Sequence, residues 1–226
     1  MIDLPDTARW VEAHGIADDP DHVELIHDGI HLAVVSGAGR LAVVTNSEAE
    51  LSLVAFSLKD RFESCAILVE RELAARVIAA ELGRRVERAV LHTLPEPDAL
   101  IPIDGAVPLP ADAPLDHLRP EVADEIRAAR GRHAMWACYV DGLPVAFAYA
   151  PWRSAKYFDI SVDVDPSARQ LGLGVIVATT LIHAEREHGR EPVWGADENN
   201  VASQRLAHRL GFVAVDELWV LPPVAP

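Results

Sequence analysis

Hydrophobic and polar residues alternate most regularly in the second half of the chain. Residues 121–130 have helical spacing and follow a proline suited to a first helical turn. Apolar stretches at 135–140 and 144–150 flank Asp141-Gly142, a strong signal for a tight hairpin. The segment 157–164 alternates strictly and indicates a third strand. This part of the chain therefore predicts a helix followed by three strands.

Helical and strand-like segments continue to alternate toward the C-terminus. The expected elements are a helix over 174–188, a strand over 192–196, a helix over 200–210 and a strand over 213–221. Gly189 and Gly211 stand where the two helices should end. The resulting order is typical of an α/β fold. More specifically, it predicts an α+β arrangement in which helices flank a mixed central sheet.

The first half of the chain predicts a smaller α/β region. Residues 31–35 and 40–44 resemble the two strands of a hairpin around the turn 36–39. Residues 69–82 have helical spacing and end at Gly83, and residues 86–92 can form a strand.

Prolines crowd the stretch between the two halves. They are Pro95, Pro97, Pro102, Pro108, Pro110, Pro114 and Pro120. Proline removes a backbone donor and disfavours helix just before it. We therefore expect residues 95–117 to connect an N-terminal region, residues 1–94, with a C-terminal domain, residues 118–226.

Composition narrows the function classes. The 226 residues include 20 Lys and Arg against 35 Asp and Glu, a formal charge of −15. This balance argues against general binding of nucleic acid and against anionic membranes, but it does not repel a cationic amine. No apolar run reaches the length of a membrane span, and Met1–Asp6 lack the pattern of a signal peptide. With Cys65 and Cys138 expected as free buried thiols, we predict a cytoplasmic protein.

The segment Val164–Gly174 carries the strongest chemical signal, because it leaves a predicted strand and opens a predicted helix. Glycines there let backbone approach a ligand, and free N–H groups at the helix start favour an anion. Val177 stands where a dinucleotide fingerprint needs a third small residue. The string Gly37–Ala42 fits that fingerprint better, but a strand follows it, which favours a hairpin turn. An ordinary glycine-rich turn is the simpler alternative for Val164–Gly174.

Carboxylates on the strand 157–164 are candidates for acid–base chemistry. Alternation puts Asp159, Ser161 and Asp163 on one face. A partly buried carboxylate beside an anion loop can act as a general base, because burial raises its pKa. A solvated strand face, or pairing with arginines, would explain the same pattern.

Histidine spacing predicts no metal site. His183 and His188 are five residues apart rather than four, and His27 and His31 flank a turn at Asp28-Gly29. Neither pair comes with a third ligand at a recognised spacing. We therefore expect surface histidines, or histidines with hydrogen-bond partners.

Two motifs, taken together, resemble the GCN5-related N-acetyltransferase (GNAT) superfamily. That family carries V-x-P-x-x-R-G-x-G-x-G at its cofactor helix, and Val164–Gly174 reads V-D-P-S-A-R-Q-L-G-L-G. It carries N-x-x-S-x-x-L and then L-G-F at the next helix, and Asn200–Phe212 matches this order. The resemblance covers roughly residues 118–221 and implies the GNAT fold there.

The resemblance implies an N-acyltransferase that uses acyl-CoA, with acetyl the expected group, and no metal. The acceptor would be an amine of a small molecule or protein, attacking the thioester directly; a homodimer is left open. The implied CoA-binding residues are Val162, Val164, Arg169, Gln170, Leu171, Gly172, Leu173, Gly174 and Asn200. Asp159 and Asp163 are the candidate bases, and Ser203 would lie at the sulfur end.

Two departures from the family pattern bear on chemistry. Gln170 replaces the usual first glycine, which is tolerated if its φ stays negative. Ala207 stands where many members have a tyrosine that serves as general acid. A non-catalytic acyl-CoA-binding module is therefore an alternative, and a nucleotide-binding α/β protein is a weaker one.

The resemblance leaves two further points open. Residues 1–94 could be a degenerate half-domain or a cap over the acceptor side. Trp136, Trp152 and Trp194 could line an acceptor cleft, although core or rim positions explain them more simply.

Overall fold

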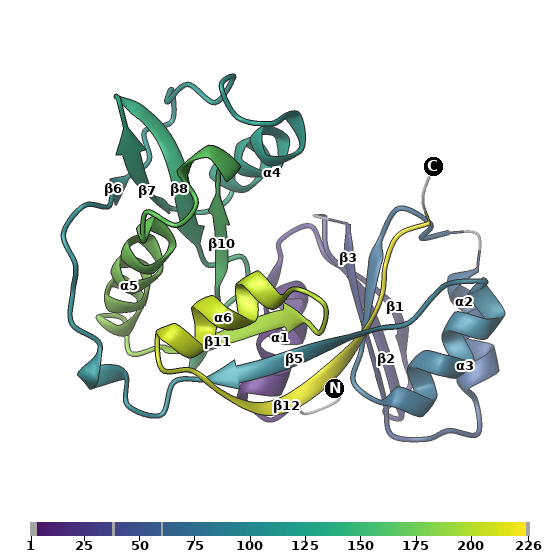
Figure 1. The fold of residues 1–226 in the computed structure, drawn as a ribbon. Coiled ribbons are helices and arrows are strands. Elements are labelled where there is room, and N and C mark those ends of the chain that lie inside the picture. The colour runs from purple at the N-terminus through teal and green to yellow at the C-terminus, as the bar shows by residue number, and fades with distance from the viewer. Residues whose placement is uncertain (1–3, 38, 60, 225–226) are drawn as a thin grey trace. The chain divides into compact units, whose positions relative to one another are not determined.

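The computed structural model describes residues 4–37, 39–59 and 61–224. The turn residue Ala38 and residues 1–3 lie outside these ranges. The chain forms two compact units (Figure 1). Unit 1 contains the chain up to Leu91, residues 195–201 and the chain from Ala214 onward. Unit 2 contains residues 92–194 and 202–213.

Unit 1 is built around a mixed sheet. Its helical elements are η1 (Ala8–Trp10), α1 (Val11–Asp18), α2 (Leu51–Leu58) and α3 (Glu72–Leu82). Its strands are β1 (Val23–His27), β2 (His31–Val35), β3 (Arg40–Thr45), β4 (Ala66–Val69), most of β5 (Glu87–Thr93) and most of β12 (Val213–Leu221). They lie in the order β1-β2-β3-β4-β12-β5. The β3–β4 pair is parallel, whereas β1–β2, β2–β3 and β4–β12 are antiparallel.

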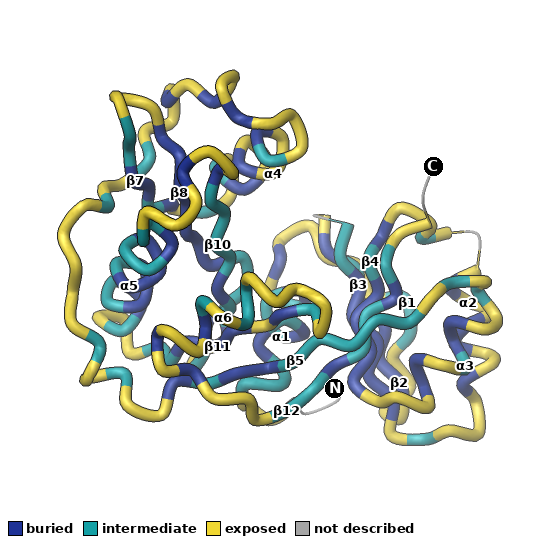
Figure 2. The backbone as a smooth tube through the Cα atoms, in the orientation of Figure 1, coloured by how far each residue is buried: buried dark blue, intermediate teal, exposed yellow. Residues whose placement is uncertain are grey.

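The core of unit 1 lies where α2 and α3 pack against the sheet. Leu41, Ile67 and Ile78 are each 0% exposed within it. Figure 2 shows both helices buried on one side and exposed on the other, as an amphipathic helix on a sheet requires. The predicted hairpin 31–44, helix end and strand 86–92 are confirmed, and Gly83 closes α3 with a φ of 64°.

Unit 2 contains a four-stranded antiparallel sheet in the order β10-β8-β7-β6. Its strands are β6 (Val107–Pro108), β7 (Met135–Val140), β8 (Leu143–Tyr149) and β10 (Ser161–Val164). The helical elements are η2 (Pro97–Ala99), α4 (Pro120–Arg130), η3 (Pro166–Ala168), α5 (Leu173–Arg186) and nearly all of α6 (Val201–Arg209). The predicted hairpin turn is confirmed, with φ of 51° at Asp141 and 81° at Gly142.

The predicted connector contributes to this sheet. Within residues 95–117, β6 pairs with β7, Val107 opposite Ala137. The proline-rich stretch is therefore partly structural, because an edge strand tolerates a residue without an N–H donor.

The single strand predicted over 157–164 is wrong, because the structure divides it at Ile160. β9 (Tyr157–Asp159) pairs in parallel with β11 (Glu191–Asp197), whereas β10 pairs antiparallel with β8. Ile160 donates its N–H to the Val193 carbonyl of β11. After Ile160 the chain leaves β11, and β10 pairs with β8 instead. The alternation of polar and apolar residues over 157–164 gives no sign of this break, since both parts of the segment remain extended.

The element order repeats along the chain. Residues 11–93 form a helix, three strands, a helix, a strand, a helix and a strand. Residues 120–221 follow the same order, with the third strand divided into β9 and β10. In both halves, the strands before and after the second helix pair in parallel, as β3–β4 and β9–β11 do.

Two smaller expectations can also be compared with the structure. Cys65 and Cys138 are free and buried, as predicted. Within the described ranges, no helix is both long and apolar enough to cross a membrane.

Candidate functional site

The segment between β10 and α5 is a structured turn. The Asp165 carboxylate caps η3 by accepting the Ser167 N–H at 2.9 Å and the Ser167 hydroxyl. These hydrogen bonds hold the pKa of Asp165 below its ordinary value. The chain then turns at Gln170, with a φ of 66°, and at Gly172, with a φ of 80°, before α5 begins.

Gln170 does not meet the condition of a negative φ under which its replacement of glycine would be free of strain. Its backbone lies in the left-handed region, which costs most side chains about 1–2 kcal/mol. The turn out of η3 into α5 demands this conformation, and the family's usual glycine would adopt it without strain.

Backbone donors converge at the start of α5. The first helical hydrogen bonds there run from Val175 and Ile176 to the Gly172 carbonyl, at 3.0 and 3.4 Å. Among the residues that the structure describes, the N–H groups of residues 170–174 donate to no acceptor. Arg169 is exposed and forms no ion pair within the described chain. The turn thus combines unpaired donors, a helix N-terminus and a cation, which together suit a phosphate.

The two glycines of the loop serve different purposes. A Cβ on Gly172 would meet nothing within 4 Å, so the backbone there is open to a ligand. A Cβ on Gly174 would lie 3.2 Å from a Leu206 methyl and 3.4 Å from a Val164 methyl. Gly174 therefore lets α5 pack closely against β10 and α6.

β10 is an edge strand with open backbone groups. Asp165 donates its N–H to Val145 at 2.8 Å, which makes these two residues a hydrogen-bonded pair. Because such pairs alternate along an antiparallel ladder, Ser161 and Asp163 also bond to β8. The peptide groups of Val162 and Val164 then face the open edge. An extended ligand with amide groups can bind there as an additional strand would.

Asp163 lies in a cluster of polar side chains. Its Oδ2 atom is buried with no hydrogen-bond partner in the described chain. Burial, with a smaller effect from the nearby Glu125 carboxylate, raises the pKa of Asp163 to about 6. The Tyr149 hydroxyl donates to Glu125 at 3.3 Å, and the His133 ring stacks on Tyr149 at 5.9 Å. Burial also raises the pKa of Tyr149 above its ordinary value. Asp163 can therefore exchange a proton near neutral pH.

The other candidate residues have different surroundings. Asp159 lies in β9, on the other side of the break from Asp163, and its N–H donates to the Trp152 carbonyl. Ser203 accepts a hydrogen bond from the Trp194 indole at 2.9 Å. Trp194 is only 2% exposed and packs edge-on against Phe212, so it belongs to the core.

Two residues of the second motif bear directly on the predicted site. Asn200 immediately precedes α6, in the segment 195–201 that belongs to unit 1, and its N–H donates to the Asp197 carbonyl. Ala207 is 0% exposed and has no group that could transfer a proton.

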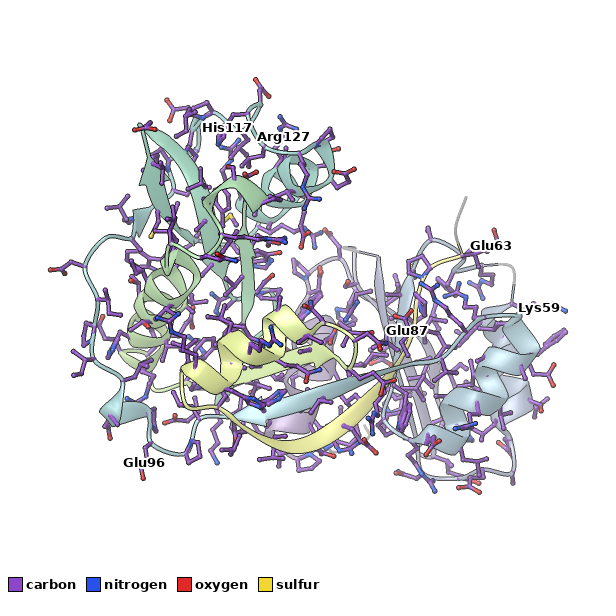
Figure 3. All side chains as sticks on the ribbon, viewed as in Figure 1. Lys59, Glu63, Glu87, Glu96, His117 and Arg127 are labelled. Carbon is purple, nitrogen blue, oxygen red and sulfur yellow. The ribbon has the colours of Figure 1, made fainter. Side chains whose placement is uncertain are left out.

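A hollow of about 290 Å³ lies beside the loop in unit 2. It is lined by His117 (labelled in Figure 3), Val140, Asp141, Leu143, Val145, Ser167, Ala168 and Leu171. Because Ser167 and Leu171 are part of the turn, this hollow offers room for groups attached to a bound phosphate.

Glu125 and Tyr149 were not predicted from the sequence as site residues. Tyr149 lies in an apolar strand and Glu125 on an amphipathic helix, so neither stands out locally. Tyr149 comes close to Asp163 only because β8 and β10 pair in the register that sets Ser161 opposite Tyr149.

Comparisons with known proteins concern the sequence of the second half of the chain and the fold. Residues 136–221 match a family model described as GNAT acetyltransferase. A search of curated proteins found no match. The fold is similar to a GCN5-related N-acetyltransferase-like protein from Streptococcus suis, with a TM-score of 0.66, 16% identity, and 96% of this chain and 93% of the other covered.

Two further solved structures have the same fold. A GNAT-family acetyltransferase described as putative, from Novosphingobium aromaticivorans, gives a TM-score of 0.65 at 19% identity, with 96% of each chain covered. A tandem GNAT protein from the clavulanic acid biosynthesis pathway gives 0.57 at 14% identity, covering 96% of this chain and 94% of the other. At these identities the likeness concerns the fold.

Proposed function

Because residues 136–221 match the GNAT acetyltransferase family model and the fold is similar to that of GNAT proteins, we propose that this chain transfers an acyl group, with acetyl expected, from acyl-CoA to a primary amine of a small molecule or protein. The observation that carries the proposal is the cradle of unpaired N–H groups at residues 170–174 beside Arg169. A pyrophosphate fits it, since each free donor can meet a phosphate oxygen. In a chain with a net charge of −15, this local donor array is distinctive.

The open edge of β10 supports the acyl-CoA assignment. The pantetheine arm carries two amides, and the peptide groups of Val162 and Val164 offer the donors and acceptors for them. The divergence of β9 and β10 at Ile160 leaves that edge open. Acyl-CoA itself supplies an activated thioester.

We assign Asp163 as the general base. An alkylammonium must lose a proton before its nitrogen can attack, and a carboxylate with a pKa of about 6 is mostly ionised at pH 7. Asp163 accepts that proton, directly or through water, as the nitrogen–carbon bond forms and the carbon–sulfur bond breaks. The departing thiolate takes the second ammonium proton, which the nitrogen loses as the amide forms and which reaches the sulfur through water or by a relay over the Ser203 hydroxyl. The nearby Glu125 carboxylate adds attraction for a cationic amine.

The test is a steady-state assay of thiol release from acetyl-CoA over a panel of primary amines. Asp163→Asn should lower kcat by about 100-fold, the low end of general-base effects, with the binding constant of acetyl-CoA unchanged. Arg169→Ala should do the reverse, weakening acetyl-CoA binding by about tenfold, as expected for the loss of one charge-assisted contact. If acetyl-CoA does not bind at millimolar concentration, the proposal is wrong.

A non-catalytic acyl-CoA-binding module is the second candidate. The buried Ala207 favours it, because the residue that many members use as general acid is replaced by a methyl group. Calorimetric binding of acetyl-CoA without thiol release across the amine panel would support this alternative. Turnover that depends on Asp163 would exclude it.

We further propose that residues 1–94 are a degenerate half-domain of the same kind. The repeated element order supports this, and one similar structure is a tandem GNAT protein. The segment before α2, residues 46–50, reads Asn-Ser-Glu-Ala-Glu and has no glycine, so it would repel a pyrophosphate. Calorimetry should therefore give one acetyl-CoA per chain; a stoichiometry of two would contradict this assignment.

A further inference from the structure

Three side chains with metal-binding atoms come together in unit 1, whereas the chemistry proposed above is centred on residues of unit 2. They are Asp28 in the turn after β1, His31 at the start of β2 and Glu50 just before α2. One potential ligand atom from each lies within 4.8 Å of the others. The sequence pattern shows Asp28 and His31 together but not the third ligand, which joins them only because β3 returns the chain to this end of β2.

His31 is the unusual member of this group. It is only 1% exposed, yet in the described chain neither ring nitrogen has a hydrogen-bond partner. An unpaired buried polar group costs about 1–3 kcal/mol, so such a ring usually has a partner. None of the protein groups described here supplies one.

The spacing to Glu50 suits a shared ion better than a direct hydrogen bond. His31 Nε2 lies 3.6 Å from Glu50 Oε2, beyond hydrogen-bond range. Two ligands at about 2.1 Å from a tetrahedral ion lie about 3.4 Å apart. The Glu50 side chain is 53% exposed and can adjust by the remaining few tenths of an ångström.

Asp28 is held in place as the third ligand. Its Oδ1 accepts the N–H groups of Ile30 and His31, at 2.8 and 2.7 Å. These hydrogen bonds keep the pKa of Asp28 below its ordinary value, so the carboxylate is ionised at neutral pH. They also fix it beside the His31 ring, with its second oxygen available for a cation.

We propose that Asp28, His31 and Glu50 bind one divalent transition-metal ion, zinc in the first instance, with water completing the coordination. One imidazole and two carboxylates form a set that zinc accepts, whereas magnesium prefers oxygen ligands alone. The ion would tie the β1–β2 turn to the N-terminal end of α2 and so stabilise unit 1. This site is independent of acyl transfer.

The place of Glu50 in the repeated element order agrees with this proposal. Residues 46–50 join β3 to α2, as residues 165–172 join β10 to α5 in the other half. The second segment carries Gly172 and Arg169, which suit an anion. The first carries Glu48 and Glu50, which suit a cation.

The experiment uses the full chain, stripped with EDTA and dialysed, then titrated with zinc chloride by calorimetry at pH 7.5. We expect one ion per chain and a higher melting temperature with zinc than without it. Glu50→Gln should weaken zinc binding at least tenfold, and because Glu50 is half exposed this variant should fold. Cobalt(II) in place of zinc should give visible d–d absorption that Glu50→Gln lacks.

Two control variants test the assignment of ligands. Glu48→Gln removes a neighbouring carboxylate that pairs with Arg71, and His27→Gln removes the other histidine of the turn, which contacts Glu24. Both should bind zinc as the unmodified chain does. The proposal is overturned if the stripped protein binds no zinc, or if Glu50→Gln binds it with unchanged affinity.

Discussion

Replacing Asp163 by Asn should stabilise the protein at neutral pH. The carboxyl is partly buried, and its Oδ2 atom has no hydrogen-bond partner in the described chain, so ionising it in the folded state is unfavourable. Asn has nearly the same shape and carries no charge. The substitution therefore removes the cost of burying a carboxylate while leaving the packing of β10 almost unchanged.

The expected magnitude follows from the pKa shift. Folding raises the pKa of Asp163 from 3.8 to about 6, and each unit corresponds to about 1.36 kcal/mol. The folded protein thus holds this proton more tightly than the unfolded chain. Its contribution to stability is complete below pH 3.8 and is lost as the pH rises through 6. The stability of Asp163→Asn relative to the unmodified chain should accordingly grow by about 2–2.5 kcal/mol between pH 4 and pH 7.

The assay is urea unfolding of both proteins at several pH values from 4 to 8. A matched control is Asp124→Asn, which removes a 76% exposed carboxylate from α4, beside Glu125. Its stability difference should vary little over the same range. A difference for Asp163→Asn that does not grow with pH would refute the argument that burial raises this pKa.

Three further substitutions test other parts of the fold by the same urea assay. Glu185 is 8% exposed and accepts hydrogen bonds from Arg153 and Arg190, which lower its pKa. Glu185→Gln should therefore lower the free energy of unfolding by about 3 kcal/mol at pH 7, and by progressively less below pH 4.5. Gly174→Val should lower the free energy of unfolding by about 1–3 kcal/mol, because its side chain would meet atoms within 3.4 Å. Unchanged stability would show that α5 can shift to make room. Gln170→Gly should raise the free energy of unfolding by about 0.5–1 kcal/mol by relieving the left-handed backbone, and unchanged stability would contradict the argument from strain.

Local chemistry explains which elements the sequence predicts well. Asp141-Gly142 specifies a hairpin because both positions need a positive φ, and Gly83 ends α3 for the same reason. The anion loop is recognisable because its glycines and its position before a helix follow one another in the chain. None of these features depends on residues far away.

Partners from distant segments are what the sequence pattern could not specify. Glu125, Tyr149 and Asp163 meet only through the register of β8 with β10 and the packing of α4. In the same way, Glu50 reaches His31 only after β3 pairs with β2.

The sequence by itself determined the main helices and strands of the second half, the hairpins and the loop that suits a phosphate, because these depend on dihedral preferences and on spacing within a few residues. Only the tertiary structure decided where the strand 157–164 divides, since the break reflects competition between β8 and β11 for its backbone. It also decided that Gln170 turns left-handed and that Asp163 is buried beside Glu125. Burial and electrostatics depend on every neighbour in space, and a linear pattern does not record them.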